Sequence, residues 1–303
     1  MSISVIIPTY NGAHKIMPLL ANLEAQTVVP DELIIVIDGS TDNTEALLRA
    51  RAFSLPNVSI IVQANGGRAK VRNTGAAAAK SDLLVFFDDD MRPMANCLQL
   101  HVQHHKYISN SILTGAQIDE DGSSLPDIRR YKAYLTRKWS RSVTPSMGQP
   151  LKQEQLFITA AHCSMPKSIF DQLNGFDERL LDAEDYDLAL RAHAQKIPVF
   201  YNEQIIAWHQ DLIDCTTYIK RMRQYAAAQK ILASLHPEVE NKYVFVQPSG
   251  LKAFFFSLFC FRFWMRSIDQ QVWKYILPKS FRYRLYDWVL TANGTFYPHK
   301  VAL

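Results

Sequence analysis

Short apolar segments alternate with helical stretches along the first half of the chain. Runs rich in Val, Ile, Leu and Phe predict buried strands at residues 3–8, 32–38, 58–62, 83–87 and 112–118. Apolar spacing or alanine-rich composition predicts helices at residues 14–26, 42–53, 69–79 and 95–107. This alternating order predicts an α/β fold with a mostly parallel sheet and helices on both faces.

Polar turn motifs follow three of the predicted strands. Residues 9–11 (Thr-Tyr-Asn) end the first strand, residues 38–40 (Asp-Gly-Ser) end the second, and residues 88–90 (Asp-Asp-Asp) end the fourth. In open parallel sheets, ligands bind outside the carboxyl ends of the strands. We therefore expect the three motifs to meet at one edge of the sheet.

The composition is that of a folded globular protein, with 303 residues, 48% of them hydrophobic, and a net charge of +4. The charge is unevenly distributed. Residues 1–215 carry 20 Lys and Arg against 25 Asp and Glu, whereas residues 216–303 carry 13 against 4 and many aromatic residues. This change predicts two parts, a domain at residues 1–215 and a helical extension at residues 216–303.

Several protein classes are excluded by motifs that the sequence lacks. The four cysteines form no C-x-x-C pair, which excludes zinc ribbons, thioredoxin-type redox sites and disulfide scaffolds, and predicts buried thiols in a reducing compartment. There is no G-x-x-x-x-G-K-[ST] motif, and no G-x-G-x-x-G follows the first strand. P-loop nucleotidases and dinucleotide dehydrogenases are therefore not expected.

Three adjacent carboxylates at residues 88–90 are the first candidate site. Asp88 and Asp90 point the same way if the backbone stays extended, and a divalent cation would relieve their repulsion. Carboxylate oxygens suit Mg²⁺ or Mn²⁺, which substrate phosphates usually help to coordinate. The alternative is a solvated acidic turn.

Glu184, Asp185 and His209 are further candidates. The two carboxylates lie at the start of a helix predicted to begin near Asp182, where a general base or a simple helix cap would each fit. His209 follows an apolar run at residues 199–207 and is either a structural residue or a nitrogen ligand for the same cation.

These motifs, in this order, resemble those of family-2 glycosyltransferases of the GT-A fold. The similar segments are residues 5–11, 37–42, 65–67, 72–75, 87–90, 174–178 and 184–191. The resemblance covers residues 3–210. It implies that residues 1–215 form a GT-A nucleotide-sugar-binding and catalytic domain that moves a sugar from a nucleoside diphosphate, with UDP as the default, to an acceptor hydroxyl with inversion.

The resemblance also implies roles for single residues. On the donor side it implies nucleotide-sugar contacts by Pro8, Thr9, Tyr10, Asp38, Arg72, Asp88 and Asp89, with Asp38 reading the base edge and Arg72 near the diphosphate. It implies Mn²⁺ or Mg²⁺ binding by Asp88, Asp90 and His209. It implies that Asp185 is the catalytic base and that Glu184 lies beside the acceptor. Residues 160–165 depart from the Gly or Asn that relatives often carry near the donor sugar.

The basic, aromatic extension bears on the acceptor. A helix is predicted at residues 216–236 and a more apolar one at residues 251–264. Such segments suit an anionic membrane surface, and packing on the catalytic domain or at a dimer contact is the alternative. With a membrane contact, the acceptor is a lipid-linked sugar or growing glycan and the protein is cytoplasmic and peripheral. The polar, basic residues 119–153 are expected to form a mobile acceptor loop or a solvated surface.

Two other functions fit parts of the pattern. A sugar nucleotidyltransferase also uses carboxylates and Mg²⁺ on an α/β sheet, but its glycine-rich phosphate loop is missing here. A non-catalytic nucleotide-sugar-binding or assembly protein would not need Glu184 and Asp185. No nucleic-acid-binding motif occurs, so a nucleic-acid partner is not expected. Neither a signal peptide nor a membrane-spanning segment is predicted.

Overall fold

The computed structural model describes residues 1–143, 148–237 and 247–300. The chain divides into two compact units. The first consists of Met1–Asp119 and Arg137–Gln210, and the second consists of Glu120–Thr136 together with the residues from Asp211 onward. The second unit therefore takes its material from two separate stretches of the chain.

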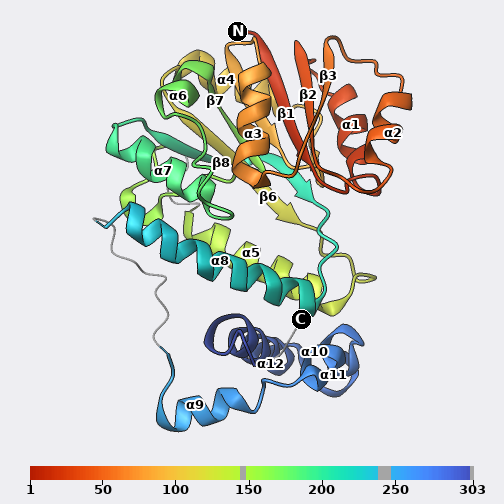
Figure 1. The fold of residues 1–303 in the computed structure, drawn as a ribbon, viewed down its shortest axis with the longest axis vertical. Helices are drawn as coiled ribbons and strands as arrows, with labels where there is room; N and C mark the ends of the chain where they lie inside the picture. The colour runs from red at the N-terminus through yellow and green to blue at the C-terminus, as the bar shows by residue number, and fades with distance from the viewer. Residues whose placement is uncertain (144–147, 238–246, 301–303) are drawn as a thin grey trace. The chain divides into compact units, whose positions relative to one another are not determined.

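A mixed sheet forms the centre of the first unit (Figure 1). Within the described residues it has eight strands in the order β3-β2-β1-β4-β7-β6-β8-β5. Their bounds are β1 Ile3–Thr9, β2 Glu32–Asp38, β3 Val58–Gln63, β4 Leu83–Phe87, β5 Met91–Pro93, β6 Ile112–Asp119, β7 His162–Pro166 and β8 Val199–His209.

The sheet contains both parallel and antiparallel strand pairs. β1 pairs in parallel with β2 and β4, β2 with β3, and β6 with β8. β7 is antiparallel to both β4 and β6, and β5 is antiparallel to β8. The prediction of a mostly parallel α/β fold is confirmed, while β5 and β7 were not predicted.

Helices cover both faces of the sheet. Their bounds are α1 Ile16–Glu24, α2 Thr44–Ala50, α3 Gly67–Ala78, α4 Cys97–Tyr107, α6 Lys167–Gln172 and α7 Glu184–Ala194. On one face, alternate residues of β1, β2 and β4 form an apolar core with α1 and α4. On the other, α3 packs on β1 and β2. A Cβ on Gly75 of α3 would come within 2.5 Å of Ile6, so glycine permits this close approach.

The second unit is helical. Its elements are the first part of α5 (Asp127–Val143), then α8 Cys215–Leu235, α9 Gly250–Ser257, α10 Arg262–Asp269, α11 Val272–Ile276 and α12 Lys279–Thr291, followed by a π-helical turn at Ala292–Phe296. The predicted helix at residues 216–236 corresponds to α8. The predicted apolar helix at residues 251–264 is instead two helices, α9 and the start of α10.

The expectation of a mobile loop at residues 119–153 is wrong for residues 127–143, which form helix α5, and residues 144–147 of this stretch lie outside the described residues. Ile128 and Tyr131 are buried in the apolar core of the second unit. Asp127 begins the helix and accepts hydrogen bonds from Arg282, at 3.0 Å from Nη2, and from the Tyr286 hydroxyl at 2.9 Å. These bonds fix the start of α5 to α12.

None of the helices in the described ranges has the length and apolar content needed to cross a bilayer.

Candidate active site

The carboxyl ends of β1, β2 and β4 lie at one edge of the sheet. The three strands are neighbours and parallel, so the motifs that follow them leave the sheet on the same side. Thr9 closes β1, Asp38 closes β2, and Asp88 follows Phe87 of β4. The predicted convergence of the three polar motifs is thus present in the structure.

Asp38 is held rigidly at this edge. Its side chain accepts hydrogen bonds from the Gln63 amide (2.7 Å) and from the backbone N–H groups of Gly66 (2.8 Å) and Gly67 (3.0 Å). Gly39 next to it has a φ of +71°, and a Cβ there would lie 2.7 Å from the Asn65 nitrogen. The turn therefore needs glycine to bring Asp38 against the start of α3.

The three adjacent carboxylates have separate partners, and the backbone turns at Asp89 and Asp90 instead of staying extended. Asp89 accepts a 2.6 Å hydrogen bond from the Thr9 hydroxyl and lies 2.7 Å from the Lys15 ammonium. Burial raises the pKa of Asp89 to about 6, although Lys15 opposes the increase. Its neighbours in the predicted donor site differ in exposure, since Pro8 is half-buried within β1 and Tyr10 is 50% exposed.

Arg72 joins two parts of the site. Nη2 donates to Asp88 and Nη1 donates to Glu184, each at 2.6 Å, and the guanidinium lies 5.8 Å from the centre of the Phe176 ring. Burial favours the neutral acid of Asp88, but the charge and hydrogen bond of Arg72 hold its pKa below the ordinary value. Arg72 and Glu184 are both almost completely buried, so this ion pair is shielded from solvent.

Asp185 follows directly at the start of α7. Its carboxylate accepts hydrogen bonds from the backbone N–H groups of Ala160 (3.3 Å) and Tyr186 (2.8 Å), and its side chain is only partly buried. Desolvation raises the pKa of Asp185 to about 7, and the charge of Glu184 adds to the increase. A carboxylate with a pKa near neutrality can exchange a proton with substrate at physiological pH.

A capping role does not account for Glu184, whereas Asp185 does accept a hydrogen bond from a backbone N–H group in the first turn of its own helix. The residue before α7, Ala183, is in the left-handed region with a φ of 62° and makes no side-chain cap. The Glu184 carboxylate accepts a hydrogen bond from Arg72 and caps no backbone N–H group of its own helix. Strained backbone of this kind concentrates at functional sites.

Asp90 and His209 form a second cluster in the candidate site. Asp90 Oδ1 lies 3.4 Å from His209 Nε2, and this buried oxygen has no hydrogen-bond partner among the described residues. His209 Nδ1 lies 2.9 Å from Asp119 Oδ1. The Gln117 amide nitrogen also lies 2.8 Å from His209 Nδ1. With its proton on Nδ1, toward Asp119, His209 directs the Nε2 lone pair at Asp90, as in metal-binding histidines with a carboxylate behind them. The residues present therefore fit a divalent cation.

The structure thus brings Asp88, Arg72, Glu184 and Asp185 together, and it pairs Asp90 with His209. Lys15 and Asp119 were missed. Asp119 carried a usable signal, because it is a carboxylate at the end of a predicted strand. Lys15 carried none, since a lysine near a turn is ordinarily solvated.

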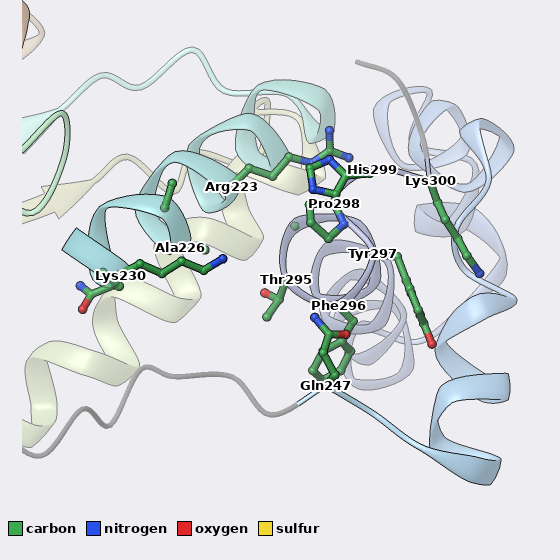
Figure 2. Close-up of a pocket in the computed structure, with 13 residues that line it drawn as sticks. Arg223, Ala226, Lys230, Gln247, Thr295, Phe296, Tyr297, Pro298, His299 and Lys300 are labelled. Atoms are coloured by element: carbon green, nitrogen blue, oxygen red, sulfur yellow. The ribbon is translucent and has the colours of Figure 1, made fainter. Parts of the chain in front are cut away.

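A separate cavity of about 650 Å³ lies within the second unit (Figure 2). Arg223 and Lys230 of α8 line it, together with the segment from Gly294 to Lys300. Gln229 also contributes to the wall and is buried, and its amide atoms have no partner within the described part of the chain. Cationic and aromatic side chains in one wall suit an anionic ligand with an apolar part.

Comparisons with known proteins agree with this architecture. A mannosyltransferase, PcManGT from Pyrobaculum calidifontis, was solved with GDP-Man and Mn²⁺. It is similar with a TM-score of 0.63 and 15% identity, over 96% of this chain and 86% of that one. S. aureus TarS 1–349 with UDP-GlcNAc has a TM-score of 0.57 and 17% identity, over 98% of this chain and 92% of that one. Together with the sheet order and the strand-end carboxylates, these likenesses define a GT-A fold.

The family follows from the sequence. The model of glycosyl transferase family 2 matches residues 4–173, and the chain belongs to this family. The uncharacterized glycosyltransferase YfnE of Bacillus subtilis strain 168 is 25% identical over 256 residues, which cover 70% of this chain. The match spans 65% of the length of YfnE.

Proposed function

We propose that the chain transfers a sugar from a UDP-sugar to an acceptor hydroxyl, with inversion at the anomeric carbon and assistance from Mn²⁺ or Mg²⁺. The observation that carries the proposal is Arg72, which links Asp88 at the end of β4 to Glu184 beside Asp185. The Arg72 cation, which can stabilise the leaving phosphate, and a proton acceptor would thereby belong to one site. Sugar transfer from a nucleoside diphosphate requires both.

The donor lies along the carboxyl edge of the sheet in this proposal. Asp38 contacts the base, and Pro8, Thr9 and Tyr10 contact the nucleoside, with the half-exposed Tyr10 ring offering an aromatic surface. The bound UDP-GlcNAc of TarS supports a uridine nucleotide. Asp89 acts indirectly, because its bonds to Thr9 and Lys15 hold the β1 turn in place.

Negative charge on the leaving diphosphate is balanced at the β4 end. Asp88, Asp90 and His209 would hold the divalent cation, which would supply Lewis-acid stabilisation of the leaving phosphate. The Mn²⁺ in PcManGT supports this assignment. Arg72 adds a fixed positive charge, and its low exposure strengthens the effect because little water screens it.

Asp185 removes the proton of the attacking acceptor hydroxyl. Its partly exposed carboxylate is available to substrate, and its raised pKa makes it a stronger base than an ordinary Asp. Attack from the side opposite the leaving diphosphate inverts the anomeric centre in one displacement. Glu184 holds Arg72 and keeps the pKa of Asp185 high.

We infer a lipid-linked sugar or growing glycan as the acceptor, in polysaccharide biosynthesis at an anionic, cytoplasmic membrane surface. Large exposed apolar side chains are frequent in the second unit, including Leu251, Phe254, Phe261, Phe263, Tyr275 and Phe281. Exposed cations accompany them at Lys252, Arg262 and Arg266. Aromatic and basic side chains in one region favour the interface of an anionic bilayer.

Turnover of a panel of nucleotide sugars tests the proposal. UDP- and GDP-sugars are incubated with the protein and Mn²⁺, with and without EDTA, and release of nucleoside diphosphate is measured. We expect turnover of a UDP-sugar that EDTA abolishes and added Mn²⁺ restores. Full turnover in EDTA would exclude the metal assignment, and binding without turnover of any donor would favour a non-catalytic nucleotide-sugar-binding protein.

A further inference from the structure

A cysteine and two histidines meet in the core of the first unit, on the face of the sheet that α4 covers. Cys97 Sγ lies 3.3 Å from His162 Nε2, and His101 Nε2 lies 3.1 Å from the same nitrogen. All three residues are fully buried, and their ligand atoms lie within 4.8 Å of one another. Cys97 and His101 are four residues apart on α4 and therefore share one helix face.

The second nitrogen of each imidazole is already engaged. His162 Nδ1 lies 3.3 Å from the carbonyl oxygen of Ala116, which can only accept, so Nδ1 carries the proton and Nε2 presents its lone pair. His101 Nδ1 lies 2.7 Å from the Ser164 hydroxyl. The Ser164 hydroxyl can donate or accept, so it orients the His101 ring, whereas the Ala116 carbonyl also sets the tautomer of His162.

The surrounding chain makes room for this arrangement. A Cβ on Gly115 would come within 2.3 Å of His162 Cε1, so only glycine lets the imidazole occupy its position. The Phe87 ring stacks on His162, with centroids 5.1 Å apart and planes inclined by 28°. The stacked Phe87 and His162 rings are thus held in one orientation before any ligand binds.

We propose that Cys97, His101 and His162 bind one Zn²⁺ ion. Zinc bonds of about 2.0–2.1 Å to nitrogen and about 2.3 Å to sulfur place the corners of a tetrahedron roughly 3.3–3.6 Å apart. The two separations from His162 Nε2, 3.1 and 3.3 Å, are close to these values, and the third pair of ligand atoms lies within 4.8 Å. One thiolate and two neutral imidazoles are a ligand set that suits zinc.

Binding is a ligand exchange without a redox change. Cys97 Sγ and the Nε2 atoms of His101 and His162 would replace water ligands of the hydrated ion, and the thiol proton would leave to solvent. The site ties the start of α4 to β7, whose residue His162 pairs with Phe87. It is distinct from the carboxylate site, because the next residue, Asp88, points to Arg72 of α3 on the opposite face.

Cobalt substitution tests the proposal. The full-length protein is produced in zinc-depleted medium supplemented with Co²⁺, and its absorption spectrum is recorded after an EDTA wash. Thiolate ligation gives a sulfur-to-cobalt charge-transfer band in the near ultraviolet, which the oxygen-rich site of Asp88 and Asp90 cannot produce. We expect the band in the parent protein, and its absence there would overturn the proposal whatever the variants do.

Two variants locate the ligand. Cys97→Ser is expected to abolish the band, whereas Cys163→Ser, a buried cysteine next to His162 on the same strand, is expected to retain it. A band that persists in Cys97→Ser refutes the site. Protein produced with zinc should contain one Zn²⁺ per chain after the EDTA wash, and a folded His101→Gln variant should contain none. Zinc retained by that variant also refutes the site.

Discussion

Arg72 donates a 2.6 Å hydrogen bond to Glu184, which lies 112 residues further along the chain. The same guanidinium binds Asp88 with its other terminal nitrogen. One cation thus lies between two carboxylates from different elements, α7 and the end of β4. Neither carboxylate can lose Arg72 without leaving a buried or half-buried negative charge uncompensated, so the three groups form one electrostatic unit.

Asp185→Asn should lower the rate of sugar transfer by about 10²-fold or more while leaving donor affinity nearly unchanged, because the amide cannot accept the hydroxyl proton. The measurement is kcat for transfer together with donor binding by calorimetry. Asp171→Asn, an exposed carboxylate on α6, is the matched control and should behave as the parent. Transfer at the parental rate by Asp185→Asn would remove this residue from the chemistry.

The rate of transfer should rise with pH through about 7. The raised pKa of Asp185 means that the base is protonated and inactive below this pH and ionised above it. Glu184→Gln removes the neighbouring charge that helps to raise this pKa and releases Arg72, so the rising limb should move to lower pH. A pH–rate profile of both proteins checks this, and an unshifted limb would disconnect Glu184 from the base.

Arg72→Met should destabilise the protein by about 3–5 kcal/mol at neutral pH, since it leaves Glu184 buried without its cation. Urea denaturation followed by circular dichroism gives the free energy of unfolding. Arg68→Met is the control, because the half-exposed Arg68–Asp182 pair should contribute no more than about 1 kcal/mol. Adding Glu184→Gln to Arg72→Met should recover part of the loss, and an additive further loss would argue against the buried pair.

Asp119→Asn should raise the Mn²⁺ concentration for half-maximal transfer by about 10- to 100-fold, because it weakens the contact that orients His209. The rate at saturating Mn²⁺ should fall much less. Mn²⁺ titrations of transfer provide the measurement, with Asp171→Asn again as the control. An unchanged Mn²⁺ requirement would indicate that His209 does not bind the cation.

Phe254→Ser combined with Phe263→Ser should reduce binding to vesicles that contain anionic phosphatidylglycerol by at least about tenfold, since each ring contributes apolar area at the interface. Flotation with these vesicles is the assay. Tyr107→Ser removes an exposed aromatic ring from the first unit and should not change binding. Equal flotation of all three proteins would contradict a membrane role for the second unit.

Apolar periodicity predicted the strands that carry the donor side of the site. β1, β2 and β4 are long apolar runs, so their ends, and with them Asp38 and Asp88, could be located from the sequence. β7 was not predicted because its residues, His-Cys-Ser-Met-Pro, mix polar and apolar types. Its burial depends on antiparallel pairing with β4. β5 is only three residues long and is defined by its partner β8.

Helix α5 was not predicted for a different reason. Its many basic residues suggested a solvated loop, yet Ile128 and Tyr131 recur at helical spacing and are buried. The meeting of Cys97 with His162 could not be predicted, because 65 residues separate them and only the tertiary fold brings them together. Contacts made by Arg72 were likewise beyond prediction from its position within a helix.

The position of helix α5 limits where the chain can be divided into fragments. Its first residues contribute Ile128 and Tyr131 to a core otherwise drawn from sequence beyond residue 210, so the two units are interleaved along the polypeptide. If the chain is cut after residue 215, the amino-terminal fragment keeps Ile128 and Tyr131 but lacks most of the apolar residues that bury them. Neither half is a removable module, and exchange of the carboxyl-terminal helices between homologous enzymes must carry residues 120–136 with them.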